Sequence, residues 1–307
     1  MPDRAYDRSA LAERLSAIAG AAHVVLNEPL SAHTTFEIGG PASVFVMPGS
    51  ADELARVIAA CREAGAPHFV LGCGSDLLVA DAGYPGVIIS LTERLTRMVA
   101  HGTTLVCEAG VRLKDAAAQA CELGLAGLEF ACGIPGSVGG ACFMNAGAYD
   151  GCIADVLESV DVLQADGSVA TIGVDDLGLG YRKSRIADEG LVVTRASFCL
   201  APGERAQIRA KMDDLTRRRE EKQPLELPSA GSTFKRPEGH FAGKLISDAG
   251  LKGWRAGGAA VSDKHAGFVV NVDRATAADV HAVIAHVQDE VERQFGVRLQ
   301  PEVRFLG

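Results

Sequence analysis

A run of small residues, GIPGSVGGA at positions 133–141, constrains this chain more than any other feature. Four of these nine residues are glycine, and the stretch MNAGAY follows at 144–149. Backbone without Cβ atoms can come very close to a ligand or to other backbone. We therefore favour a large planar or phosphorylated ligand lying against this loop over a purely structural loop packed on a helix.

A second glycine cluster, GCGSD at 72–76, follows the apolar run HFVLG at 68–72. Backbone N–H groups in such a turn can converge on a phosphate, and Ser75 adds a hydroxyl donor. Alone, this loop is equally well explained as a tight turn without a ligand. Two phosphate-compatible loops together suit a dinucleotide, although the GxGxxG pattern of a Rossmann site and the GxxxxGK[ST] pattern of a P-loop are absent.

A third cluster, AGSTFKRP at 230–237, places Ser232 beside a glycine and shortly before Lys235 and Arg236. This serine has three interpretations: a nucleophile, a proton donor or a turn residue. The flanking residues are not GxSxG, so a nucleophile elbow is unsupported. Judged by itself, the cluster is best interpreted as a turn. The basic residues and glycines that continue beyond it, including Lys244 and Lys264, are expected where a domain binds an anionic ligand.

Charge and composition narrow the function classes. The 307 residues carry 30 basic and 39 acidic side chains, a net charge of -9, which argues against a general nucleic-acid or anionic-membrane surface. Aromatic residues make up only 5%, too few for base-stacking platforms. The charged N-terminal residues do not resemble a secretion signal, and no apolar run approaches the roughly 18 residues of a spanning helix, so we expect a cytoplasmic protein.

Cysteine spacing and local sequence patterns add expectations about metal sites and secondary structure. The eight cysteines form no CxxC pair, which favours buried free thiols over metal ligands, and no metal site is expected. An Asp166-Gly167 turn predicts a hairpin, and the mixture of elements predicts an α+β chain. We expect helices at 52–64, 113–123, 206–223 and 276–295, and strands at 68–72, 87–91, 105–108, 156–163, 169–172, 191–196 and 303–306.

Eight blocks in one order give the chain a resemblance that extends from about residue 25 to its end. They are TTFEIGG at 34–40, GCGSDLLVAD at 72–81, GIPGSVGGACFMNAGAYDG at 133–151, YRKS at 181–184, GSTFKRP at 231–237, AGKLISDAGLKG at 242–253, KHAGFVVN at 264–271 and PEVR at 301–304. The set closely resembles the UDP-N-acetylenolpyruvoylglucosamine reductase (MurB) family, in its shorter, type II, form.

The resemblance implies a fold and a domain plan. The fold is an FAD-binding domain of the vanillyl-alcohol-oxidase (PCMH) type followed by a C-terminal α+β substrate domain. Residues 1–66 would be the N-terminal part of the FAD-binding region, 67–202 the FAD-binding α+β domain, 203–300 the substrate-binding domain, and 301–307 a strand returning to the active site.

The resemblance also implies an activity and its reactants. Such an enzyme reduces UDP-N-acetylglucosamine enolpyruvate to UDP-N-acetylmuramate in peptidoglycan precursor synthesis, and so serves cell wall biogenesis, cell shape and cell division. NADPH is the implied reductant and FAD the implied cofactor. A hydride would reach C3 of the enolpyruvyl group through flavin N5, and a proton would reach C2.

Family positions then fall on particular residues of this chain. Arg182 would bind the substrate carboxylate and the developing enolate, Ser232 would donate the proton, and Glu302 would be the third polar group. The FAD contacts would be Gly72, Cys73, Gly74, Ser75, Asp76, Gly133, Ile134, Pro135, Gly136, Ser137, Gly139, Gly140 and Ala141. Substrate contacts would come from Tyr181, Lys235, Arg236, Lys244, Lys264 and Arg304, with Arg217 and Arg218 as further candidates for the diphosphate.

Two departures and two rival functions bear on these expectations. Arg236 stands where the longer form of the family has an asparagine. Related flavin oxidases often carry the flavin on a histidine of the first glycine loop, but Cys73 and Asp76 stand there instead, so we expect non-covalent FAD. We expect a monomer without nucleic-acid or membrane partners. The alternatives are an FAD-dependent oxidase of an alcohol or sugar, and a non-catalytic sugar-nucleotide binding protein.

Overall fold

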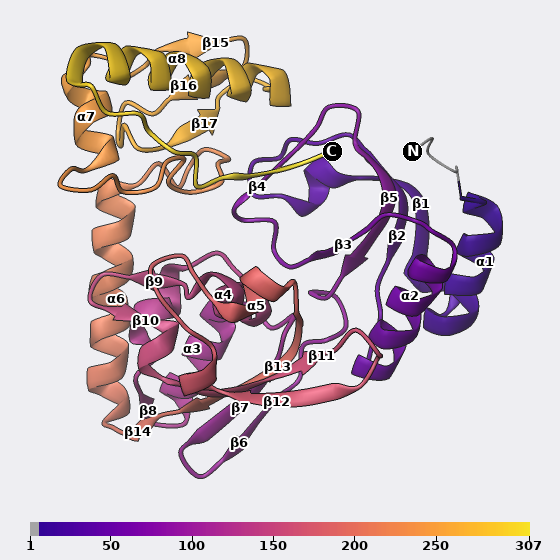
Figure 1. The fold of residues 1–307 in the computed structure, drawn as a ribbon. Coiled ribbons are helices and arrows are strands. Elements are labelled where there is room, and N and C mark those ends of the chain that lie inside the picture. Colours follow the sequence, from indigo (N-terminus) through magenta and orange to yellow (C-terminus); the bar gives the residue numbers. More distant parts are fainter. Residues whose placement is uncertain (1–5) are drawn as a thin grey trace. The chain divides into compact units, whose positions relative to one another are not determined.

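A computed structural model describes residues 6–307 and divides the chain into two compact units (Figure 1). Of the described residues, unit 1 comprises 6–26, Val44–Cys73 and Gly86–Arg218, and unit 2 comprises Asn27–Ser43, Gly74–Pro85 and Arg219–Gly307. Residues 1–5, which begin the first expected segment and the charged N-terminal stretch, lie outside the described residues. Each unit has its own hydrophobic core.

The larger sheet of unit 1 has five strands in antiparallel order. The inward side chains of its strands alternate with partly exposed ones, as the two-residue period of a half-buried strand requires; Leu105 and Cys107 are fully buried while Val106 is not. In spatial order the strands are β12 (Val169–Gly173), β11 (Leu157–Leu163), β13 (Val192–Cys199), β7 (Thr104–Glu108) and β6 (Met98–His101).

Helices cover this sheet and build the rest of unit 1. Helix α4 (Val138–Met144) packs against β13 and β7, and α3 (Leu113–Glu122) lies beside α4 (Figure 1). Helices α1 (Arg8–Ala19) and α2 (Ala51–Glu63) pack on each other. The apolar face expected for α2 is confirmed, because Leu54, Val57, Ile58 and Cys61 are buried and Ser50 Oγ caps the helix by accepting from Glu53 N.

A four-stranded sheet joins segments from the first ninety residues. Strands β3 and β5 of this sheet are parallel. The first glycine cluster, at 72–76, begins directly after the last residue of β3. The unit boundaries fall inside three of the sheet's strands, β1, β2 and β5. In spatial order the strands are β1 (Val24–Pro29), β2 (Pro41–Val46), β5 (Tyr84–Ser90) and β3 (His68–Leu71).

Unit 2 is a small antiparallel sheet covered by a long helix. Helix α8 (Ala277–Phe295) packs its apolar face on the sheet (Figure 1), and a Thr276–Asp279 capping box begins it. A second pairing joins the end of the chain to the first glycine cluster, because β18 (Arg304–Leu306) runs parallel to β4 (Leu77–Val79). The sheet strands are β15 (Arg255–Ala256), β16 (Ala259–Val261) and β17 (Val269–Asn271), and α7 (Ala242–Asp248) completes the unit.

The remaining elements are short except for α6, which contains the unit boundary after Arg218. They are α5 (Arg185–Glu189), α6 (Arg205–Lys222), β8 (Leu125–Ala126), β9 (Gly147–Ala148), β10 (Gly151–Cys152), β14 (Ala201–Pro202), and the 3-10 turns η1 (Ala21–His23), η2 (Leu30–His33), η3 (Glu129–Gly133), η4 (Ile153–Asp155) and η5 (Val174–Asp176).

Most elements expected from the sequence are confirmed to within a few residues, including the charged helix, observed at Arg205–Lys222, and the Asp166-Gly167 hairpin between β11 and β12. The α+β class is confirmed as well. No helix or strand is expected before residue 52 from the sequence, yet α1, β1 and β2 form there. Strand β1 carries little apolar alternation and leaves most side chains partly exposed, so its sequence gives a weak signal.

The cysteines are less buried than the sequence predicts. All eight cysteines are free, as expected, but only Cys61, Cys107, Cys121 and Cys142 are buried, and Cys199 is exposed at the end of β13. The expectation of buried thiols is therefore wrong for Cys199, which is still paired with Thr104 but lies on the opposite face of the strand from the buried Phe198. The compact units are discontinuous, but compactness does not test which segments bind which ligand. The four segments expected above therefore stay a prediction.

Candidate active site

The two glycine clusters meet inside unit 1. A Cβ atom added to Gly72 would lie 2.4 Å from Ser137 Oγ, so the two loops are in close contact at this glycine and a side chain there would displace the serine hydroxyl. Ser137 is also the N-cap of α4, where its Oγ accepts from Gly140 N at 3.3 Å. Two loops that lie far apart in the sequence are thus adjacent at Gly72 and Ser137.

Glycine serves the same close approach further along the second cluster. Gly139 N donates to Ala109 O at 2.8 Å, and a Cβ on Gly139 would lie 2.9 Å from the Ala109 Cβ. Gly136 O accepts from Leu113 N at 2.9 Å, which fixes the start of α3 against the same loop. Backbone–backbone packing therefore holds the 133–141 loop in place.

The second half of the first cluster belongs to unit 2. Gly74 has φ +59, and a Cβ there would lie 2.3 Å from the His33 carbonyl oxygen. Gly74 O accepts from Thr35 N at 3.3 Å, and Asp76 O accepts from Arg304 N at 2.8 Å. This half of the loop is held between the 34–40 segment and the C-terminal strand.

Cys73 is the only thiol in the first cluster, and it is partly buried. Burial raises the pKa of Cys73 to about 11, and the nearby Arg112 guanidinium opposes this rise only in part. The thiol therefore stays protonated near neutral pH, which makes it a poor nucleophile.

Ser232 and Glu302 lie on neighbouring backbone segments of unit 2. Ser232 pairs with Phe268 as a β-bridge, and Phe234 pairs with Pro301 on the other side. Between them, Thr233 N donates to Gly267 O at 2.8 Å and Thr233 O accepts from Glu302 N at 2.8 Å. The 232–235 segment thus runs between 267–269 and 300–302. Ser232 is exposed at the surface of this unit, and Glu302 is half-buried.

A histidine supports the turn before Phe268. His265 Nδ1 accepts from Gly267 N at 3.1 Å, and Ser262 Oγ accepts from His265 N at 3.3 Å. Burial lowers the pKa of His265 below its usual value, consistent with a neutral ring that can accept a hydrogen bond. This turn sets the position of the strand with which Ser232 pairs.

Thr35 connects the first glycine loop with the loop that leads to Ser232. Besides its N–H bond to Gly74, its Oγ1 donates to Ser229 O at 2.7 Å, and its carbonyl accepts from Ser229 N at 3.0 Å. All of these residues belong to unit 2. Thr35 lies in the first of the eight sequence blocks. Sequence reasoning missed its connecting role, because no local pattern predicts that it pairs with Ser229.

Arg182 belongs to unit 1, on a two-residue turn. Gly180 and Lys183 close the turn by exchanging backbone hydrogen bonds of 3.0 and 3.2 Å. Arg182 adopts the left-handed conformation with φ +52, and its guanidinium lies 5.5 Å from the centre of the exposed Tyr181 ring. The structure therefore brings Ser232 and Glu302 together in one unit and puts Arg182 in the other.

The cationic candidates for substrate contacts are mostly paired with carboxylates on the surface. Lys244 Nζ lies 2.6 Å from Asp248, Lys264 Nζ lies 3.6 Å from Glu226, and Asp214 pairs with both Arg217 and Arg218. Arg236 instead lies over the Phe241 ring, 4.0 Å from its centre. Lys235 and Arg304 are exposed, and their backbone N–H groups bond Gln300 O and Asp76 O. Surface ion pairs of this kind are weak and exchange readily for another anion.

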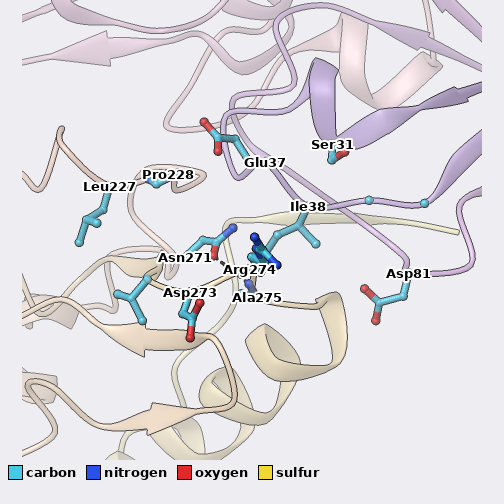
Figure 2. Close-up of a pocket in the computed structure, with 13 residues that line it drawn as sticks. Ser31, Glu37, Ile38, Asp81, Leu227, Pro228, Asn271, Asp273, Arg274 and Ala275 are labelled. Atoms are coloured by element: carbon cyan, nitrogen blue, oxygen red, sulfur yellow. Dashed lines mark hydrogen bonds between the residues drawn. The ribbon is translucent and has the colours of Figure 1, made fainter.

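Unit 2 also contains an open pocket of about 600 Å³ beside residues 37–40 (Figure 2). Asn271 holds its wall by donating to Phe36 O at 3.2 Å, and Asp81 accepts from Ala277 N at 2.7 Å. None of the residues assigned a role above lines it. Its lining is Ser31, Glu37, Ile38, Gly39, Gly40, Asp81, Leu227, Pro228, Asn271, Val272, Asp273, Arg274 and Ala275.

The described part of the chain offers neither a metal cluster nor a membrane-spanning helix. Within residues 6–307, no group of three or more His, Cys, Asp or Glu side chains is arranged to hold a metal ion. Over the same residues, no helix combines the length and the apolar character needed to cross a bilayer.

The class of protein follows from the family models that the chain matches. Residues 42–173 match the model "FAD binding domain", and residues 223–306 match the model "UDP-N-acetylenolpyruvoylglucosamine reductase, C-terminal domain". The chain is therefore an FAD-binding oxidoreductase with this C-terminal domain, which confirms the expected fold class. More particularly, it belongs to the UDP-N-acetylenolpyruvoylglucosamine reductase (MurB) family, and its length agrees with the shorter form.

Relatives and a solved structure support this assignment along nearly the whole chain. The reductase of Clostridium beijerinckii is 52% identical over 92% of this chain and 93% of its own. That of Alkaliphilus metalliredigens is 44% identical over 98% of this chain and 99% of its own. The crystal structure of UDP-N-acetylenolpyruvylglucosamine reductase (MurB) from Thermus caldophilus has a TM-score of 0.79 and 37% identity, covering 92% of this chain and 98% of that one.

Proposed function

We propose that this chain, a reductase of peptidoglycan precursor synthesis, reduces UDP-N-acetylglucosamine enolpyruvate to UDP-N-acetylmuramate with NADPH as reductant and FAD as cofactor. Family membership supports the reaction. The observation that carries it at the level of residues is the pairing of the 232–235 segment with 300–302, which makes Ser232 and Glu302 neighbours. We further propose that the protein works in the cytoplasm as a monomer, and that segments 67–202 and 203–300 bind the flavin and the substrate.

Two features of the glycine loops support a flavin dinucleotide there. Gly72 of the first loop lies against Ser137 of the second, and Ser75 and Ser137 carry hydroxyl groups that can bond a phosphate. We propose that residues 72–76 hold the pyrophosphate and residues 133–141 the isoalloxazine ring. When bound, the flavin supplies hydride transfer from NADPH to C3 of the enolpyruvyl group.

Arg182, Ser232 and Glu302 then have distinct proposed roles. The Arg182 guanidinium binds the substrate carboxylate and stabilises the negative charge that grows on it, because its planar fork of donors matches two carboxylate oxygens. Ser232 donates the proton to C2 through its Oγ. Glu302 orients the reacting groups beside Ser232, to which its segment is tied through Thr233.

The substrate diphosphate needs cations, and we propose that some surface pairs open to meet it. Lys244 and Lys264 are the candidates in unit 2, together with Lys235, Arg236 and Arg304. Arg217 and Arg218 are further candidates, and Tyr181 lies beside Arg182 as a contact for the same ligand. Each exchange replaces an exposed carboxylate by a phosphate, which costs little because exposed pairs contribute only about 0–1 kcal/mol.

We expect FAD to be released from the protein by acid. The first loop has no histidine, and burial raises the pKa of its one thiol, Cys73, to about 11, so neither usual covalent link to the flavin is favoured there. Precipitation with trichloroacetic acid should leave the yellow colour in the supernatant. Colour retained in the washed pellet contradicts non-covalent binding.

The proposed activity is tested by the visible spectrum of the purified protein without oxygen. NADPH should bleach the flavin, and UDP-N-acetylglucosamine enolpyruvate added afterwards should restore the oxidised spectrum. Bleaching by a simple alcohol or sugar instead, with reoxidation by oxygen alone, identifies a flavin oxidase. A protein that binds the sugar nucleotide without any spectral change is a non-catalytic binding protein.

A further inference from the structure

We propose that Asn145 is a positioning residue for Arg182, acting through the turn that carries it. The inference rests on the proposed function, because it assumes that Arg182 binds the substrate carboxylate. Asn145 does not itself touch the substrate in this proposal. It fixes where the arginine turn begins, relative to the loop that we assign to the flavin.

The side chain of Asn145 ties together two segments of unit 1. Its Nδ2 donates to Gly180 O at 3.0 Å, and its Oδ1 accepts from Ala154 N at 3.0 Å. Only 9% of Asn145 is exposed, and both of its side-chain hydrogen bonds are partly buried. Gly180 is the first residue of the closed turn that presents Tyr181 and Arg182. The Asn145 side-chain amide thus holds the carbonyl of Gly180, the residue at which the turn begins.

The backbone of Asn145 explains why an asparagine stands there. It is the C-cap of α4 in the left-handed conformation, with φ 42 and ψ 58. Apart from glycine, asparagine tolerates this conformation best. Glycine would satisfy the backbone equally well but would lack the amide. The capping geometry therefore does not require the two side-chain bonds.

The far end of the turn is anchored to the same helix. Ser184 is fully buried, and its Oγ donates to Phe143 O at 2.6 Å while accepting from Ala187 N at 3.1 Å. Phe143 and Asn145 both belong to the C-terminal end of α4. Both ends of the turn therefore rest on one helix end.

The other end of α4 carries the flavin loop. Its N-cap is Ser137, whose Oγ occupies the space beside Gly72. The two-turn helix α4 thus extends from Gly72 and the 133–141 loop to the arginine turn, and all three lie within unit 1. In this arrangement the turn that carries Arg182 and the 133–141 loop, to which we assign the flavin, are attached to opposite ends of α4.

Such support matters because the turn is strained and its task demands accuracy. Arg182 has φ +52, a conformation unfavourable for a long side chain unless its surroundings impose it. A displacement of about 1 Å of a group that orients the reactants can slow a reaction by about 10²-fold. Losing the Asn145 amide leaves Gly180 O bonded only to Lys183 N, within the turn itself. The turn then loses its tie to the end of α4 at this residue, and we expect the guanidinium to lose its fixed position.

The test variant is Asn145→Gly, which keeps the left-handed cap and removes only the amide. We expect FAD content and flavin reduction by NADPH to match the wild type, while reoxidation by UDP-N-acetylglucosamine enolpyruvate slows by about 10- to 100-fold. Asn27→Gly is the matched control, since Asn27 is exposed on β1 and also left-handed, with φ 56. It should reoxidise at the wild-type rate.

A double-mutant cycle separates positioning from general stability. In the Arg182→Lys background the bidentate contact is already lost, so Asn145→Gly should slow reoxidation by less than about 3-fold more. Asn145→Asp keeps the acceptor for Ala154 N but cannot donate to Gly180 O, and it should be as slow as Asn145→Gly.

Three results overturn the proposal. The first is a double mutant in which the two single-mutant decreases in reoxidation rate multiply in full. The second is a wild-type reoxidation rate in Asn145→Gly or Asn145→Asp, and the third is loss of FAD from Asn145→Gly. The last result would show that the amide serves the flavin site and not Arg182. Failure of the proposed function is recognised separately, because the wild-type protein itself would then not be reoxidised by the enolpyruvyl substrate.

Discussion

Replacing Ser232 by alanine is expected to slow reoxidation of the flavin by UDP-N-acetylglucosamine enolpyruvate by about 10²–10⁴-fold, the contribution typical of a positioned acid. Flavin reduction by NADPH should be unchanged, because it does not need the proton at C2. The substitution removes the Oγ but leaves the local fold intact, since the backbone of this segment makes the bonds to 267–269 and 300–302.

The measurement is stopped-flow absorbance of the two half-reactions, each followed without oxygen. Ser247→Ala is the control, since Ser247 is an exposed serine on α7 in the same unit and has no proposed role. It should leave both half-reactions unchanged. If Ser232→Ala is reoxidised as fast as the wild type, Ser232 is not the proton donor, and another donor must serve C2.

Gly74→Ala is expected to yield protein that has lost most of its FAD. The added methyl group would lie 2.3 Å from the His33 carbonyl oxygen and 3.0 Å from the Thr34 Cα, both backbone atoms that cannot move aside alone. The residue also has φ +59, which disfavours any side chain. The loop must therefore shift away from the 34–40 segment, and with it the proposed pyrophosphate seat.

The check is the ratio of flavin to protein absorbance after purification, together with the Kd of added FAD. Gly102→Ala is a closely matched control: Gly102 has φ +61 at the turn between β6 and β7, and a Cβ there meets nothing within 4 Å. It introduces only the left-handed strain of about 1–2 kcal/mol and should retain FAD. Wild-type FAD content in Gly74→Ala would contradict the assignment of this loop to the cofactor.

Elements with a strong local signal are predictable from the sequence. Helix α2 follows from the spacing of Leu54, Val57, Ile58 and Cys61, and the β11–β12 hairpin follows from Asp166-Gly167. Strands β1 and β2 escape prediction because their stability comes from partners elsewhere in a sheet and not from their own pattern. The discontinuous units have the same origin, since strands from distant parts of the chain pair with one another.

The candidate site divides in the same way. The eight blocks, through the family resemblance, make Arg182, Ser232, Glu302 and both glycine loops the candidates, whereas the residue types alone favour a turn at Ser232. The supporting residues are not predictable, because their roles depend on contacts between distant segments. Asn145 is an ordinary helix-ending residue in sequence, and Thr35 is one threonine of a block; their bonds to Gly180 and Ser229 give them their proposed roles.

By itself, the sequence determined the class of elements, the excess of glycine in three clusters, the family and the chemistry that its side chains can perform. These depend on local backbone preference and on the identity of residues in order along the chain. The tertiary structure alone decided that Gly72 meets Ser137, that Ser232 and Glu302 flank Thr233, and that one short helix connects the glycine loops to the arginine turn. Such contacts arise from sheet pairing and core packing between distant segments, which no local pattern encodes.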